Sequence, residues 1–392
     1  MPGDLILGVD FGSSSTIAGT LVGDRIQLVQ DAGDCVIPSV VYIPDRGPPE
    51  IGRRAIARQL IDPSKVIRSV KRVLGLSGSS ELVRHYAASV PYKVELTADR
   101  VMYKLRSGDL APEQIVASIL GHVRDLAEAR FGGRASKIVM TMSAAAPAGY
   151  RDAAVRAAKI AHLEVLDLVA EPIAGALALD LHTQAANRRI IVCDFGGGTF
   201  DVSAVEQRGL RFTPIATAGD HYLGGDDLDD AIAEAIAGHV FKTARYDMHK
   251  DIVRWNELLL RCESAKRQLS VRPEAPIALR EAYRQAGRSH DLNIVLDRPW
   301  VDRVWATHFE RATGVVIELL RRAGWTASDV DVVGMIGGSS QVPAFAAAIG
   351  ATLGAHKLVH ADNAELAVAQ GATLLTARYR SRESSVRILD VA

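Results

Sequence analysis

The sequence has little of what a secreted or membrane-spanning protein would show. Its three cysteines, Cys35, Cys193 and Cys262, are isolated and lack paired CxxC spacing. We therefore expect reduced core thiols rather than disulfides or zinc ligands. No hydrophobic run is long enough to span a bilayer, and the N-terminus has no signal-peptide pattern. The cytosol is the expected location.

Charge of one sign is not in excess either. The sequence holds 46 Lys and Arg against 46 Asp and Glu, for a formal net charge of +0. Such a balance gives no overall attraction to nucleic acid or to an anionic membrane. We expect neither as a partner.

What the sequence does have is length and apolar content. A chain of 392 residues that is 48% hydrophobic is a folded protein too long for one core. Apolar runs predict buried strands at 5–11, 137–142, 190–195 and 331–336. Helical patterns alternate with them, at 112–130, 148–163, 228–243, 254–270, 303–323 and 343–354. This alternation predicts an α/β fold.

Two strand-to-turn junctions resemble each other closely. ILGVDFGSSST begins at Ile6, and IIVCDFGGGTF begins at Ile190, nearly half the chain later. One Asp-Phe-Gly turn after a strand would be an ordinary junction. Two of them, each followed by small residues, predict duplicated lobes with a cleft between them.

These two loops suit phosphate chemistry. The segments 12–15 and 196–199 present successive backbone N–H groups with little side-chain obstruction, and such concave arrays bind anions. Asp10 and Asp194 precede them. A carboxylate would repel bare phosphate, so we expect Mg²⁺ between them, held through its water shell.

Two further glycine pairs occur, at Gly224-Gly225 and at Gly337-Gly338-Ser339. The second follows a strand and precedes a Pro-started helix, which suits a nucleoside at a helix N-terminus, although either pair could be a plain turn. A protein kinase is not indicated, because the HRD loop, the VAIK-type lysine and the upstream glycine loop are missing. A Walker A loop is missing too.

Several motifs together resemble those of the seventy-kilodalton heat-shock chaperones. They appear in the family's order across 5–380: DFGSSST, IPSVVY, SVKRVLG, LEVLDLVAEPIAGALA, DFGGGTFDVS, GDHYLGGDDLD, CESAKRQLS and IGGSSQVP. The resemblance implies the actin-like ATPase fold, with two lobes, each with a mixed or parallel sheet flanked by helices, and a central nucleotide cleft. It implies lobe I at 1–187 with a peripheral subdomain at about 38–111, lobe II at 188–380 with one at about 226–304, and a linker-like tail at 381–392.

The resemblance also implies roles for individual residues. ATP or ADP is held with Mg²⁺ and a monovalent cation such as K⁺. The phosphates are implied to contact Gly12, Ser13, Ser14, Ser15, Gly197, Gly198 and Thr199. Gly196, Gly224 and Gly225 are implied to belong to the nucleotide site as well. Asp10 and Asp194 are implied to organise Mg²⁺, and Asp201 to lie near the monovalent cation. Lys71 would neutralise charge at the γ-phosphate, while Glu171 and Thr199 would position the attacking water.

The adenosine end is implied to lie on one helix and one loop. Glu263, Lys266 and Ser270 share a helix face, with Arg267 covering the base. Gly337, Gly338, Ser339 and Gln341 complete the pocket. A solvated helix face is the alternative for the 263–270 charges, and a helix-end pair is the alternative for Lys71 and Arg72.

This sequence departs from the family pattern in the adenosine motif and in the outward relay. Gln341 stands where the family has Arg, so one side of the adenine sandwich is in doubt. Ser143 replaces a Pro that the family uses, with the Arg found here as Arg151, to relay the nucleotide state. The family's Arg, Asn and Thr become Asp167, Ala170 and Ile173 on a surface that receives J-domain co-chaperones. An Arg-to-Asp reversal should repel such a partner.

The end of the chain resembles the family's apolar interdomain linker, with Arg387 interrupting 386–391. We therefore expect either a chain cut after the linker or a lone nucleotide-binding domain. In both cases peptide clients would bind only through a C-terminal domain that this chain lacks.

Our interpretation is an ATP-binding, slowly hydrolysing chaperone domain with nucleotide, J-domain co-chaperone and exchange factor as expected partners. Three alternatives stay open: an actin-like filament protein, a metabolite kinase of the same superfamily, and a non-hydrolysing nucleotide sensor. ATP-dependent sedimentation would reveal the first, and ATP consumption that depends on a small alcohol would reveal the second.

Overall fold

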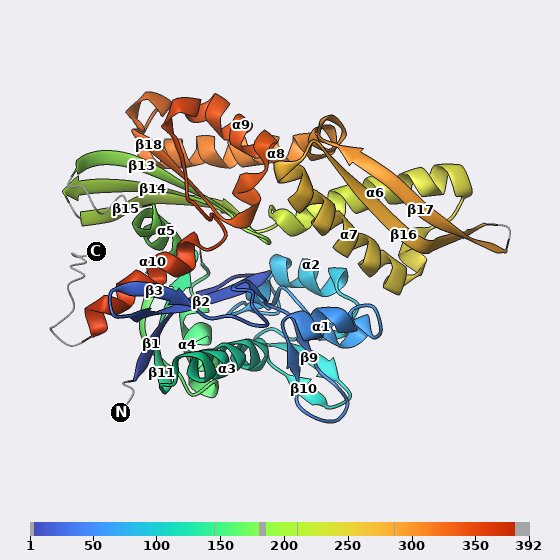
Figure 1. The fold of residues 1–392 in the computed structure, drawn as a ribbon, viewed down its shortest axis with the longest axis horizontal. Helices are drawn as coiled ribbons and strands as arrows, with labels where there is room; N and C mark the ends of the chain where they lie inside the picture. Colours follow the sequence, from blue (N-terminus) through green and yellow to red (C-terminus); the bar gives the residue numbers. More distant parts are fainter. Residues whose placement is uncertain (1–3, 145, 180–185, 210, 286, 381–392) are drawn as a thin grey trace.

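The computed structural model describes residues 4–144, 146–179, 186–209, 211–285 and 287–380. Within these ranges the chain forms two lobes, each built on a sheet flanked by helices (Figure 1). No helix in these ranges is long and apolar enough to cross a bilayer. The linker-like segment 386–391 lies outside the described residues.

The first lobe is built on a sheet with the order β12-β11-β1-β2-β3. Strand β1 (Leu5–Phe11) lies parallel to β11 (Ala135–Met142) and antiparallel to β2 (Ser15–Val22). Most of β1 is buried because helices cover both faces of the sheet. The remaining strands and the two helices on one face are β3 (Arg25–Leu28), β4 (Ile37–Pro38), β12 (Glu164–Ala170), α3 (Pro112–Phe131) and α4 (Tyr150–Ile160).

The second lobe repeats this plan with the order β15-β14-β13-β18-β19. Strand β13 (Ala186–Phe195) lies antiparallel to β14 (Phe200–Gly209) and parallel to β18 (Val332–Ile336). In each lobe an Asp-Phe-Gly loop therefore joins the first central strand to an antiparallel neighbour. The other elements are β15 (Arg211–Asp220), β19 (Leu358–His360), α8 (Arg298–Ala323) and α9 (Pro343–Leu353).

Two small-residue helices lie between the sheets and join the lobes. They are α5 (Glu171–Ala178) and α10 (Ala367–Leu375), and Figure 1 shows them between the two sheets. Although α10 comes late in the chain, it packs on β1, β2 and α5. An added Cβ at Gly371 would lie 1.9 Å from the Ala174 oxygen, so the helices cross almost backbone to backbone.

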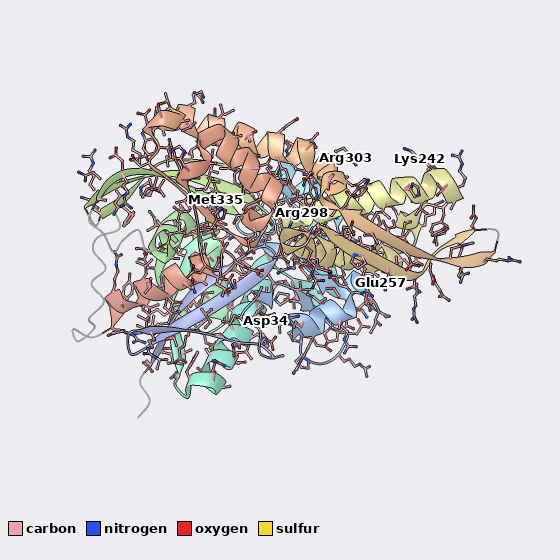
Figure 2. All side chains as sticks on the ribbon, turned by 45° about the horizontal axis from the view of Figure 1, so that its top comes forward. Asp34, Lys242, Glu257, Arg298, Arg303 and Met335 are labelled. Carbon is pink, nitrogen blue, oxygen red and sulfur yellow. The ribbon has the colours of Figure 1, made fainter. Side chains whose placement is uncertain are left out.

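A peripheral part stands on each lobe at the open end of the molecule. The second lobe carries the helical pair α6 and α7 and the hairpin β16–β17. Exposed Lys242 projects from α6 (Figure 2). Met335, by contrast, belongs to the central strand β18 and is buried. The bounds of the peripheral elements are α6 (Gly225–Ala244), α7 (Ile252–Val271), β16 (Glu274–Gln285) and β17 (Arg288–Asp297). The first lobe carries α1 (Arg53–Arg58), α2 (Glu81–Ser89), β5 (Val41–Tyr42), β6 (Glu50–Ile51), β7 (Val66–Ile67), β8 (Val94–Leu96), β9 (Val101–Leu105) and β10 (Gly108–Leu110).

The predicted strands and helices are present, with shifted ends. The helix predicted at 303–323 begins at Arg298, because the Asp297 side chain accepts a hydrogen bond from the Trp300 N–H, 2.8 Å long. The helix predicted at 148–163 ends at Ile160, close before His162, which has a left-handed backbone (φ 60°). The α/β fold class is confirmed.

Candidate functional site

A cavity of about 440 Å³ lies between the lobes, where the two Asp-Phe-Gly loops face each other. Nearly every residue predicted for the site lines it. These residues are Asp10, Gly12, Ser13, Ser14, Ser15, Lys71, Glu171, Asp194, Gly196, Gly197, Gly198, Thr199, Glu263, Lys266, Arg267, Ser270, Gly337, Gly338, Ser339 and Gln341. Asp201, Gly224 and Gly225 are not part of this lining.

The two loops have the same local geometry. The Gly12 N–H donates to the Ser15 oxygen (2.9 Å), and the Gly196 N–H donates to the Thr199 oxygen (3.1 Å). The loops also approach each other closely, since a Cβ on Gly197 would lie 2.3 Å from the Ser14 hydroxyl oxygen. Only glycine leaves room there, so the glycine requirement follows from the contact between lobes as well as from ligand access.

Three carboxyl groups, of which Glu171 is buried and Asp10 and Asp194 are half-buried, meet one lysine at the base of the cavity. The Lys71 Nζ lies 2.8 Å from Glu171 Oε1, and the Thr141 hydroxyl donates to Asp10 Oδ1 (3.0 Å). Burial, with Glu171 nearby, raises the pKa of Asp10 to about 6. The pKa of Asp194 is also raised, by burial and then by Glu171 and Asp10. Burial alone would lower the pKa of Lys71, but the Glu171 carboxylate raises it overall.

This cluster has more acids than bases, which fits a cation bound between the loops. Within the described ranges, no three Asp, Glu, His or Cys side chains are grouped closely enough to hold a metal ion directly. A Mg²⁺ ion that keeps several waters and contacts carboxylates through them matches this donor set. Asp10 and Asp194 are the residues that would hold it.

Asp201 lies behind Thr199 rather than in the cavity lining. It accepts hydrogen bonds from the Ser143 hydroxyl (3.0 Å) and the Thr199 hydroxyl (3.1 Å). Burial and the nearby Glu171 raise its pKa to about 6. Its predicted place near a monovalent cation stays a prediction.

Gly224 and Gly225 support the second loop from the start of α6. The Gly225 N–H donates to the Gly196 oxygen (3.0 Å), and the Asp226 N–H donates to the Gly197 oxygen (2.7 Å). A Cβ on Gly224 would lie 2.4 Å from the Gly197 oxygen. These glycines therefore let the helix begin directly against the loop, while contact of either with the nucleotide stays a prediction.

The other end of the cavity is built by α7 and by the loop after β18. Lys266 is buried, and its Nζ donates to Gly225 O and Asp229 Oδ2, both at 2.6 Å. Arg267 spans from Glu263 (3.2 Å) to Glu365 (3.1 and 3.3 Å). Gln341, predicted to complete the adenosine pocket, lines this end.

Sequence reasoning missed several lining residues, among them Arg68, Asp226 and Glu365. Asp226 follows directly on the Gly224-Gly225 pair, and that adjacency was a usable signal. Ser14 donates to both Asp226 carboxylate oxygens (3.0 and 2.9 Å), which links the first loop to α6. No local pattern marks Glu365, which the fold brings to Arg267 from far along the chain.

The structure also places the residues that depart from the family pattern. Asp167 lies on β12 and accepts a hydrogen bond from the Tyr379 hydroxyl (3.1 Å). Ile173 is 1% exposed and packs in the core between the lobes. The prediction that it belongs to a docking surface is therefore wrong, because a buried side chain cannot meet a partner.

The Hsp70 protein family model matches residues 6–392. The chain belongs to the Hsp70 family. Hsp70 proteins are chaperones, and their ATP-binding domain has the actin-like ATPase fold seen here in two equivalent lobes. Membership in the Hsp70 family favours the chaperone interpretation over the filament and metabolite-kinase alternatives.

Proposed function

We propose that this chain is the Mg²⁺-dependent, slowly ATP-hydrolysing nucleotide-binding domain of a chaperone, and that it acts in the cytosol. The observation that carries the proposal is the base of the cavity. There, two glycine loops from different lobes face each other across Asp10, Asp194, Glu171 and Lys71. A triphosphate with a divalent cation complements this mixture of donors and acids.

The residues of the chain divide the work as follows. The N–H groups of loops 12–15 and 196–199 bind phosphate oxygens. Lys71 carries a positive charge toward the terminal phosphate, and Glu171, 2.8 Å from it, orients both the lysine and the attacking water. Bound Mg²⁺ would neutralise phosphate charge and orient the phosphate oxygens, with Asp10 and Asp194 holding the ion.

Titration calorimetry with ATP, combined with phosphate release, tests the proposal. We expect micromolar binding in Mg²⁺ and at least about tenfold weaker binding in EDTA, because the buried carboxylates then repel the phosphates. Absence of binding in Mg²⁺ would remove the proposal. Binding without phosphate release would favour the non-hydrolysing sensor, which the Gln341 and Ser143 departures support.

The adenine end is expected to depend on Arg267. Its guanidinium is held across the cavity between Glu263 and Glu365 and is the basic group placed to cover a base. We expect Arg267→Ala to weaken adenosine binding by roughly three- to tenfold, the scale of one cation–π contact. Gln341→Arg should strengthen it. Adenosine affinity measured by calorimetry checks both, and equal affinities in the two variants would contradict this assignment.

We propose that standard J-domain partners stimulate this protein poorly. Asp167 places a carboxylate on β12 where the family has Arg, and it is tied to Tyr379. Asp167→Arg should increase stimulation by a generic J-domain protein at least about tenfold, since a like-charge contact costs several kcal/mol and about 1.4 kcal/mol already corresponds to tenfold. Tyr379→Phe is the control, because it removes the hydrogen bond and keeps the charge. Ordinary stimulation of the wild type would overturn the idea. An exchange factor remains an expected partner.

A further inference from the structure

Arg72 is next to Lys71 in the sequence but points to a different part of the molecule. Both residues lie on the short 3₁₀ helix at Val70–Val73 in the first lobe. Lys71 lines the cavity, whereas Arg72 crosses to the second lobe and is not among the cavity residues. Its side chain is only 14% exposed.

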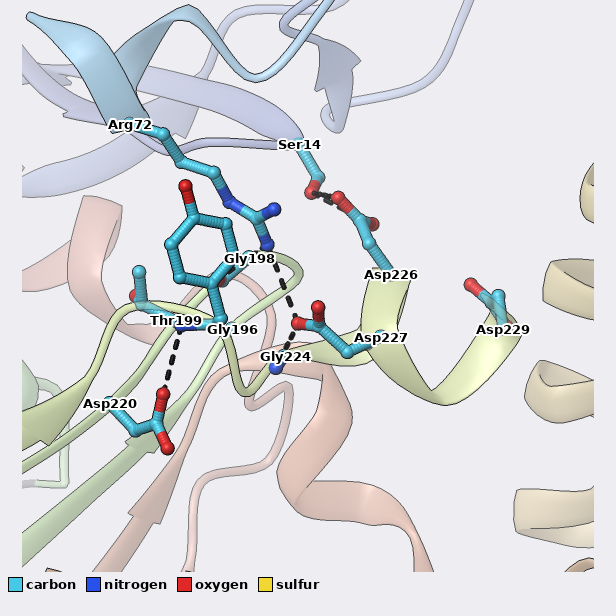
Figure 3. Close-up of polar contacts among 12 residues, drawn as sticks. Ser14, Arg72, Gly196, Gly198, Thr199, Asp220, Gly224, Asp226, Asp227 and Asp229 are labelled. Atoms are coloured by element: carbon cyan, nitrogen blue, oxygen red, sulfur yellow. Dashed lines mark hydrogen bonds and ion pairs between the residues drawn. The ribbon is translucent and has the colours of Figure 1, made fainter. Parts of the chain in front are cut away.

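Three groups of the second lobe hold the Arg72 guanidinium, and Figure 3 shows two of them, Gly198 and Asp227. Its Nη2 donates to the Gly198 carbonyl (2.9 Å) and lies 3.4 Å from Asp227 Oδ2. Its central carbon lies 4.8 Å from the centroid of the Tyr222 ring, in a cation–π contact.

Two of these groups, Asp227 and Tyr222, are themselves held. Asp227 accepts from the Gly224 N–H (2.7 Å). The Tyr222 hydroxyl donates back across the cleft to the Leu82 carbonyl of the first lobe (2.7 Å), and Arg311 donates to the Tyr222 carbonyl (3.1 Å). The guanidinium therefore has one well-defined place.

The contact with Gly198 matters because of peptide geometry. The Gly198 carbonyl and the Thr199 N–H belong to one trans peptide unit, in which the two point in opposite directions. Gly197 and Gly198 give the segment wide conformational freedom, so this peptide could rotate at little cost. With the carbonyl held by Arg72 on one side, the Thr199 N–H is turned to the other side. Thr199 lines the cavity.

We propose that Arg72 is a positioning residue for hydrolysis: it fixes the Gly198–Thr199 peptide so that the Thr199 N–H faces the terminal phosphate. The proposal rests on the proposed ATPase function. It assigns to Arg72 a role distinct from that of Lys71, since Arg72 acts through the backbone of the opposite lobe and touches no nucleotide.

Single-turnover hydrolysis of Mg-ATP in Arg72→Gln and Arg72→Lys is the test. Loss of one oriented donor typically reduces turnover by roughly 10²-fold or more, and a peptide that is only partly misoriented loses less. We expect Arg72→Gln to lower kcat at least about tenfold, with a smaller change in KM. Lysine can still reach the carbonyl, so Arg72→Lys should recover part of the rate. Adenosine affinity should not change.

Arg84→Gln is the matched control, because it removes the same charge from an exposed site on α2 and leaves the loop untouched. Wild-type kcat in Arg72→Gln, or a KM increase with unchanged kcat, would overturn the inference. If the wild type binds Mg-ATP but releases no phosphate, the proposed function fails instead. Arg72→Gln should then still weaken Mg-ATP binding relative to adenosine, and an unchanged ratio of the two affinities would overturn the role of Arg72.

Discussion

Replacing Lys71 by alanine should reduce phosphate release by roughly 10²- to 10³-fold while Mg-ATP binding persists, because a buried charge aimed at the terminal phosphate acts mainly in the transition state. The geometry supports this role. The Lys71 side chain is 13% exposed, and its ammonium lies 2.8 Å from Glu171 and shares the base of the cavity with Asp10. Its charge does not depend on pH near neutrality, since the neighbouring carboxylates raise its pKa.

A stability effect must be separated from this loss of rate. Removing one partner of a buried ion pair leaves the other unpaired and can cost about 3–5 kcal/mol. Lys71→Met keeps most of the side-chain volume, and the double variant Lys71→Met, Glu171→Gln removes the unpaired charge. Lys71→Ala, Lys71→Met and the double variant should all be inactive, while the double variant should be more thermally stable than either single variant. Phosphate release near the wild-type rate by any folded Lys71 variant would exclude the assigned role.

Replacing Gly371 by alanine should lower the free energy of unfolding more than the same replacement at an uncrowded helical glycine. A Cβ there would lie 1.9 Å from the Ala174 oxygen and 2.5 Å from its carbonyl carbon. Neither is a flexible side chain, so α10 and α5 must move apart. We expect a loss of about 3 kcal/mol or more, at the upper end of overpacking effects, and a melting midpoint lower by roughly 5–10 °C.

Gly121→Ala on α3 is the matched control for this prediction. It is the same substitution in a helix, but no heavy atom lies within 4 Å of the added Cβ. We expect unchanged or slightly higher stability there, by up to about 1 kcal/mol, because alanine is the better helix former. Thermal unfolding of both variants by circular dichroism decides. Equal midpoints would show that the α5–α10 crossing does not limit stability.

The sequence by itself determined those strands and loops that can be recognised from a short stretch of residues. The strands ending at Phe11 and Phe195 are visible as apolar runs, since a strand buried on both faces needs no alternation. The glycine loops after them are visible because only glycine and small residues permit such turns. Their near repetition predicted two equivalent lobes, and the register of β1–β2 and β13–β14 has that form.

The tertiary structure decided what depends on contacts between distant segments. Helix α5, which reads EPIAGALA, is small and apolar all round, so it has no amphipathic period to reveal it, and its partner α10 comes from the far end of the chain. Glu365 meets Arg267, and Arg72 meets Gly198, only because the lobes close on each other. Local sequence determines where a strand or turn can form. Which carboxylate faces which cation is set by packing between lobes, and no short window of sequence contains that information.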